Sequence, residues 1–214
     1  RSGTCAHCVA AHAQRGVSGM QAVKRLLMPA ALLWQLALPA AAGAAAPGVE
    51  VENRDGRFVV RSAATVAADA AVAWQVISDY NRLAEFVPDL RFSRIISAPG
   101  EPLQVEQGGE AGFFIFRFPL HVVLEITEFA PRRLTFRAIR GNLRSMRGEW
   151  RIRSAASGVV LDYFAELEPA FWVPSLVGPA VIRRDVAAQI GAVVREIERR
   201  QAVHAAPSAS SQDK

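Results

Sequence analysis

Cysteine and acidic side chains are absent from long parts of this 214-residue sequence. The two cysteines are Cys5 and Cys8, and all 20 acidic residues lie at or beyond Glu50. So few cysteines exclude a small disulfide-held scaffold, and a hydrophobic fraction of 51% excludes a chain that is disordered throughout. The sequence also lacks a phosphate-binding glycine loop, a G-x-S-x-G turn and an H-E-x-x-H motif. Enzyme classes that depend on those motifs therefore find no support in it.

The net charge of +5 is concentrated in the first 49 residues, which carry four bases and no acids and so leave +1 for the remainder. Lys24 and Arg25 precede an apolar run over 26–38, and alanines follow it. This layout is typical of a secretory signal peptide, and its A-x-A pattern predicts cleavage at about residues 42–46. An uncleaved membrane anchor is the alternative, but a run of 13 residues falls short of the roughly 20 that a spanning helix needs. We therefore expect a periplasmic or secreted protein.

The first 19 residues precede the first methionine, Met20, and we interpret them as an upstream extension. They contain Cys5, His7, Cys8 and His12, whose thiolates and imidazoles are ligand types that zinc accepts. A single C-x-x-C without a second pair is more simply a chance occurrence, and cleavage of the leader would remove it. The expected mature protein then has no cysteine, which excludes a thiol nucleophile, a disulfide and a cysteine-bound metal. We expect no cofactor and no metal.

After the leader, the sequence has the pattern of a single α+β domain. We divide the chain into an upstream extension (1–19), a signal peptide (20–44), a linker (45–56), the domain (57–201) and a disordered tail (202–214). The tail is assigned from its small and polar residues and its proline. Because the mature chain is nearly neutral, we expect no nucleic-acid partner.

The expected domain begins with one strand and two short helices. Residues 57–66 alternate loosely and predict the strand. Helical spacing predicts a first helix over 70–77 and a second over 83–86, which Pro88 stops. The expected N-caps are Asp69 for the first helix and Asp79 or Asn81 for the second.

A series of strand candidates follows, and it leaves no room for crossover helices, so the sheet is expected to be antiparallel. The candidates are 91–97, 103–110, 113–128, 133–139, 148–154 and 158–168. Turn residues, including Gly108-Gly109 and Gly141-Asn142, separate them. In the third candidate, one parity holds Phe114, Phe116, Phe118, Leu120, Val122, Leu124 and Ile126, and the other holds Arg117, His121, Glu125 and Thr127. One face of the sheet is thus expected to be apolar and the other polar.

The longest helical pattern runs over 180–201. Its apolar stripe consists of Ile182, Val186, Ile190, Val193 and Ile197. This stripe has to be buried, and the apolar sheet face is the available surface. Small residues such as Ala187 and Gly191 lie beside it, so either the helix packs close to the sheet or a space remains between them.

This order of elements resembles the helix-grip fold of the START-like (SRPBCC) superfamily. Within 70–89, the sequence A-A-V-A-W-Q-V-I-S-D-Y-N-R-L-A-E-F-V-P-D is similar to the early helix pair of that superfamily. Within 141–150, G-N-L-R-S-M-R-G-E-W resembles the Gly-x-x-Arg and Gly-x-Trp hairpin of the coenzyme Q-binding and polyketide cyclase branch. The resemblance covers about 57–201 and is more specific for the fold than for a ligand.

The resemblance implies a curved antiparallel sheet wrapped around the C-terminal helix, with an apolar cavity for lipids, quinones or polyketides between them. The candidate ligand-binding residues are Phe114, Phe116, Phe118, Phe136, Trp150, Tyr163, Arg144, Val186 and Ile190. For the phenylalanines, an ordinary filled core is the alternative. The hydroxyl of Tyr163 can orient a ligand carbonyl or simply bond to backbone, and Arg144 can hold a ligand oxygen or satisfy loop carbonyls.

No catalytic residue is assigned, because His121 has the outward parity of its strand. We expect a non-catalytic binding or transfer protein for a hydrophobic small molecule, with transient membrane contact. An aromatase/cyclase or dehydratase acting on a polyketide-like substrate is the alternative, although expected export opposes it. A ribosome-associating protein is the second alternative, which the near-neutral charge and expected export both oppose.

Overall fold

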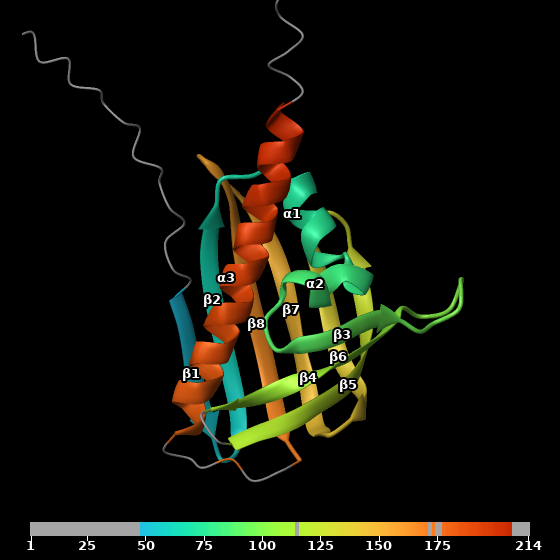
Figure 1. Cartoon of the computed structure of the whole chain (residues 1–214), viewed down its shortest axis with the longest axis vertical. Helices are drawn as coiled ribbons and strands as arrows, with labels where there is room; N and C mark the ends of the chain where they lie inside the picture. The colour runs from blue at the N-terminus through green and yellow to red at the C-terminus, as the bar shows by residue number, and fades with distance from the viewer. Residues whose placement is uncertain (1–47, 114–115, 171–172, 174–176, 207–214) are drawn as a thin grey trace, which may run out of the picture. The chain divides into compact units, whose positions relative to one another are not determined.

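The computed structural model describes residues 48–113, 116–170, 173 and 177–206 (Figure 1). The expected extension, with its C-x-x-C motif, and the expected signal peptide lie outside the described residues, as does the chain beyond residue 206. No helix among the described residues is both long enough and apolar enough to span a membrane.

An eight-stranded antiparallel sheet forms the main layer of the domain, in the order β1-β2-β8-β7-β6-β5-β4-β3. Its strands are β1 (Gly48–Arg54), β2 (Arg57–Val66), β3 (Leu90–Ile95), β4 (Gln104–Phe113), β5 (Phe116–Phe129), β6 (Arg133–Gly141), β7 (Leu143–Ala155) and β8 (Gly158–Pro169). Consecutive strands from β3 to β8 are neighbours in the sheet, whereas β2 pairs directly with β8. The antiparallel sheet expected from the turn residues is confirmed.

The helices are α1 (Ala70–Ile77), the single 3₁₀ turn η1 (Tyr80–Arg82), α2 (Leu83–Phe86) and α3 (Gly178–Ala205). Figure 1 shows α3 lying along one face of the sheet, with α1 and α2 beside it. α3 contacts β1 and β2 at one end of the strand order and β4 near the other end. A helix touches both ends of a sheet only if the sheet curves around it, so the expected α+β helix-grip arrangement is confirmed.

The expected linker contains a strand. β1 pairs with β2 along its length, and the turn between them is Asp55-Gly56, with φ angles of 54° and 87°. Two successive positive φ angles are typical of the tight hairpin turns that Asp-Gly favours. Val51 is buried on the inner face, whereas the acids beside it point outward. The domain therefore begins by Gly48 rather than at residue 57.

The C-terminal helix is longer than expected, because α3 continues through 202–205, which was assigned to the disordered tail. Gln201 anchors this end of α3. Its Oε1 accepts the backbone N–H of Asp69 over 3.0 Å, and its Nε2 donates to Asp69 Oδ2 over 3.2 Å. The sequence predicts that the Asp69 side chain caps α1, and this prediction is wrong. The contacts with Gln201 explain why, because they engage the side chain of Asp69 elsewhere.

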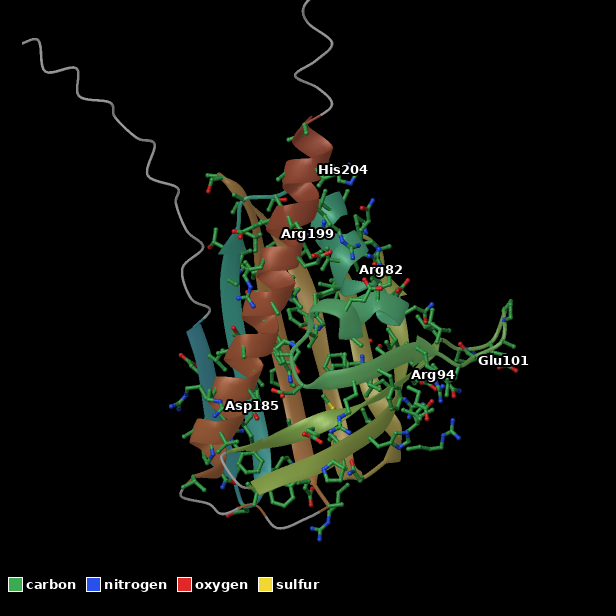
Figure 2. The ribbon with its side chains drawn as sticks, in the orientation of Figure 1. Arg82, Arg94, Glu101, Asp185, Arg199 and His204 are labelled. Carbon is green, nitrogen blue, oxygen red and sulfur yellow. The ribbon has the colours of Figure 1, made fainter. Side chains whose placement is uncertain are left out.

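The other two expected caps also have different partners. Asp79 makes no capping bond to η1, and its Oδ2 accepts a hydrogen bond from Arg200 of α3 over 2.8 Å. Asn81 accepts the backbone N–H of Ile95 over 2.9 Å and so satisfies a donor of the edge strand β3. In both cases the polar side chain joins two elements instead of finishing one helix. Figure 2 shows Arg82 and Arg199 at this junction between the short helices and α3.

The core lies between the inner sheet face and the helices. Its most deeply buried large side chains include Phe58, Leu161, Ile190 and Ile197, each at most 2% exposed. The opposite face is polar and carries cross-strand ion pairs such as Arg147–Glu166 on β7 and β8. The predicted division into an apolar and a polar sheet face thus holds for the described strands.

Candidate functional site

A cavity of about 190 Å³ lies inside the domain. One wall is the inner face of β4 to β8, and the other comes from α3 and from the segment over 77–90 that contains η1 and α2. Val186, Ile190 and Val193 line the cavity from α3. The sheet supplies mostly aliphatic and aromatic side chains from alternate positions, so the lining is largely apolar.

Five of the nine predicted site residues lie around this cavity. They are Phe136, Trp150, Tyr163, Val186 and Ile190. The side chains of the first three come from β6, β7 and β8, and those of the last two from α3. The structure therefore brings together residues that are up to 54 positions apart in the sequence.

The predicted phenylalanines on β5 are placed differently. Phe118 is partly buried but does not line the cavity, whose β5 wall begins at Leu120. Phe114 lies outside the described residues. Phe116 begins β5, but its side chain is not among those described.

Arg144 lies away from the cavity, contrary to the prediction. Its side chain is 68% exposed, and its Nη1 is 3.2 Å from Glu168 Oε1 on β8. The reason is a shift in strand register between Leu143 and Ser145, where β7 carries one extra residue against β8. Arg144 and Trp150 both have even numbers, so simple alternation would place them on the same face of β7. The bulge breaks this alternation and turns Arg144 toward the opposite face.

Three aromatic rings form one wall of the cavity. The rings of Phe136 and Tyr163 are nearly parallel, with centroids 6.2 Å apart and planes 20° apart. The rings of Trp150 and Tyr163 are 4.6 Å apart at 49°. Both spacings fall in the range of favourable aromatic contacts. The wall therefore presents neighbouring ring faces and edges, a surface suited to packing against flat apolar molecules.

The hydroxyl of Tyr163 is the polar group of this wall. Among the described residues, no group makes a hydrogen bond with it, and burial raises the pKa of Tyr163 well above its ordinary value of 10. It therefore stays protonated at neutral pH and can donate a hydrogen bond to a molecule in the cavity.

Two other polar side chains in the lining already have partners. Tyr80 on η1 donates to Glu128 Oε1 over 2.5 Å. Burial, with a further contribution from Glu128, raises the pKa of Tyr80, so this hydroxyl is also protonated at neutral pH. Gln107 on β4 donates to Ser93 over 3.3 Å. These bonds join the η1 segment to β5 and β4 to β3, which stabilises the rim of the cavity.

The sequence did not indicate the residues at the rim. Asp89 and Leu90 follow α2, and Gly108 and Gly109 face them from within β4. The sequence predicts both a strand over 103–110 and a turn at Gly108-Gly109. In the structure these glycines lie within β4, which continues to Phe113, and the neighbouring strand comes very close to them. A Cβ at Gly109 would overlap the carbonyl oxygen of Asp89, and one at Gly108 would overlap the ring of Phe92. Glycine here signals close approach of the edge strand.

His121 is exposed, as its parity predicted. Its side chain is 50% exposed, and its Nε2 is 2.9 Å from Glu106 on the outer face of the sheet. It does not line the cavity.

The fold and the cavity agree with what the chain resembles. Residues 66–194, more than half of the chain, match the family described as polyketide cyclase / dehydrase and lipid transport. The chain therefore belongs to this family. No curated protein matches it by sequence.

Solved structures of START-like proteins have the same fold. The Zhui aromatase/cyclase from Streptomyces sp. R1128 is 19% identical, with a TM-score of 0.55 over 67% of this chain and 95% of that one. A START superfamily protein from Mycobacterium smegmatis is 15% identical, with a TM-score of 0.54 over 68% and 98%. A STAR-related lipid transfer protein from Xanthomonas axonopodis is also 15% identical, with a TM-score of 0.51 over 72% and 99%. At these identities the likeness establishes a shared fold.

Proposed function

We propose that the protein is an exported, non-catalytic carrier that binds a hydrophobic small molecule between α3 and the sheet. The observation that carries this proposal is the apolar cavity lined by Phe136, Trp150, Tyr163 and the α3 stripe. Apolar clefts with few polar groups are the usual form of small-molecule sites. The family's description includes lipid transport, which supports the same function.

The size of the cavity limits the ligand. Its volume of about 190 Å³ is below the roughly 300–1,000 Å³ of sites for drug-sized ligands. A compact ring system or a short chain suits this space, whereas a larger ligand would need α3 or the segment over 77–90 to move outward.

Export is supported by the basic, apolar and alanine-rich order of residues 20–44. N-terminal sequencing of the protein from fractionated cells tests it directly. A new terminus at about residues 42–46 in the envelope fraction is expected, whereas an intact leader in the cytoplasm would contradict export.

Transfer to and from a membrane is the second part of the proposal. Phe92, Ile95 and Ile96 are exposed on and just after the edge strand β3, close in sequence to the Asp89 and Leu90 rim. Figure 2 shows the connection after β3, with Glu101 at its tip, projecting from the sheet. These exposed apolar side chains support a brief contact with lipid. Ile95→Ser is expected to slow ligand exchange with vesicles of the uncharged lipid phosphatidylcholine and to leave equilibrium binding unchanged. An unchanged rate would remove these side chains from the proposal.

The main experiment is native mass spectrometry of the protein purified from its own host's envelope. Retention of one apolar molecule per chain is expected. Val193→Phe fills the cavity from α3 and should abolish retention. Val203→Phe is the matched control, because it makes the same substitution on the same helix at a side chain that is 62% exposed. Equal retention by both variants, with both correctly folded by circular dichroism, would contradict the carrier.

An aromatase/cyclase is the second candidate function, and the free hydroxyl of Tyr163 in the cavity favours it. This hydroxyl is placed to donate a hydrogen bond to a substrate carbonyl. Turnover of a linear polyketide mimic that is abolished by Tyr163→Phe would support the enzyme. Stoichiometric binding without turnover would support the carrier.

A further inference from the structure

The cavity carries features that distinguish among apolar ligands. The aromatic wall is on one side, and the branched side chains of Val186, Ile190 and Val193 are on the other. The near-parallel rings of Phe136 and Tyr163 favour a flat molecule over a bulky one, because offset stacking maximises contact between ring faces.

The aromatic wall of the cavity offers a hydrogen-bond donor at one defined place. On the opposite side, Gln189 of α3 also belongs to the lining, but it is exposed to solvent. The two tyrosines of the lining differ as donors, since Tyr80 already donates to Glu128. The hydroxyl of Tyr163 has no partner among the described residues, and burial keeps it protonated. A polar group in an apolar cavity gains free energy when a ligand completes its hydrogen bond.

Within the described part of the chain, the rim of the cavity carries one acidic side chain whose charge is not compensated by a neighbouring base. Asp89 and Glu110 both lie in the lining, from the α2–β3 turn and from β4. Glu110 pairs with Arg91, whereas the carboxylate of Asp89 has no partner among the described residues. An anionic ligand entering here would meet a like charge and would also lose its hydration inside the cavity.

From these three observations we propose that the cavity selects an uncharged, flat ring compound with one hydrogen-bond acceptor, which receives the Tyr163 hydroxyl. Tyr163 and Asp89 are then specificity-determining residues. Tyr163 favours ligands with a hydrogen-bond acceptor, and Asp89 disfavours negatively charged ligands. This inference rests on the proposed binding function and specifies the chemistry of the ligand.

Three small probes test it by isothermal titration of the full chain: 1-tetralone, tetralin and 1-naphthoate. Tetralone and tetralin differ only by one carbonyl group. In Tyr163→Phe, tetralone should bind about 3- to 10-fold more weakly, the effect of one neutral hydrogen bond, while tetralin is unaffected. In Tyr80→Phe, any change should be the same for both probes, because that hydroxyl is already bonded to Glu128.

Asp89→Asn tests the charge selection. Asp89 has a φ of 62°, a conformation that asparagine also adopts, so this substitution keeps the turn. Naphthoate should bind about two- to fivefold more tightly to the variant, while the two neutral probes are unchanged.

The outcomes separate this inference from the proposed function. If none of the probes binds the wild-type chain at millimolar concentration, the binding function fails and the inference fails with it. If tetralone binds but loses nothing in Tyr163→Phe, or if tetralin loses as much as tetralone, the acceptor selection is overturned and the carrier stands. If naphthoate binds the wild-type chain as tightly as tetralone does, the charge selection is overturned.

Discussion

Replacing Glu196 with glutamine should destabilise the domain in a pH-dependent way. Glu196 lies on α3 with its side chain only 10% exposed. It accepts two hydrogen bonds from Arg199, at 2.7 and 2.8 Å, and one from Arg200 at 2.7 Å. Arg200 also binds Asp79 at the start of η1, so this cluster connects α3 to the segment that forms one wall of the cavity.

The magnitude follows from the pKa of Glu196. The hydrogen bonds from Arg199, and then the one from Arg200, lower this pKa from 4.5 to about 2. One pKa unit corresponds to about 1.4 kcal/mol, so the ionised form stabilises the fold by at most about 3 to 4 kcal/mol. Because the pKa is lowered in the folded state, this contribution is complete above pH 4.5 and is lost as the pH falls toward 2.

The assay is urea unfolding followed by circular dichroism at pH 7, 5 and 3. Glu196→Gln should unfold with a free energy about 2–3 kcal/mol below wild type at pH 7, and the difference should shrink at pH 3. Glu198→Gln is the matched control on the same helix, because Glu198 has no ion pair among the described residues, and it should change little at any pH. A Glu196→Gln deficit that stays constant from pH 7 to pH 3 would refute the reasoning.

Three further substitutions test the packing, the rim and the corrected site. Ile190→Ala, at a side chain 2% exposed, should cost about 2–5 kcal/mol in guanidinium unfolding and enlarge the cavity; a loss below about 1 kcal/mol would contradict close packing of α3. Gly109→Ala should lower the Tm by several degrees in a thermal scan, because the added Cβ overlaps the Asp89 carbonyl oxygen. Each kcal/mol of lost stability lowers the Tm by about 2–4 °C. An unchanged Tm would show that the rim backbone moves aside without loss of stability. Arg144→Ala should change the free energy of unfolding by less than about 0.5 kcal/mol and leave ligand retention intact, because its ion pair with Glu168 is exposed; lost retention would return Arg144 to the site.

The elements that the sequence predicted well have strong local signals. Helix α1 has the predicted bounds, because its apolar spacing begins after Asp69 and ends before the turn at Asp79. Strand β2 also has the predicted bounds, 57–66. The inner faces of β6 and β8 follow from simple alternation, which is why Phe136 and Tyr163 were expected to face inward.

The features that were missed depend on interactions between segments. Strand β1 is a mixed apolar and acidic edge strand, and its Asp55-Gly56 turn was the one local signal that could have revealed it. The bulge that turns Arg144 outward leaves no mark in its parity. Gly108-Gly109 has the composition of a turn, so the predicted strand ends at residue 110, whereas β4 continues to Phe113 and β3 comes close to its glycines. The rim residues of the cavity come together through tertiary packing, which periodicity does not encode.

The most direct test of the account is whether a ligand lies between α3 and the sheet. Nuclear Overhauser effects from 1-tetralone to labelled methyl groups of the full chain measure this contact. The account predicts effects to the methyl groups of Ile190 and Val193, which face the cavity. In Val193→Phe, the effects to the Ile190 methyl groups should be lost. Effects confined to the exposed methyls of Ile95 and Ile96, with none to Ile190, would contradict binding inside the domain.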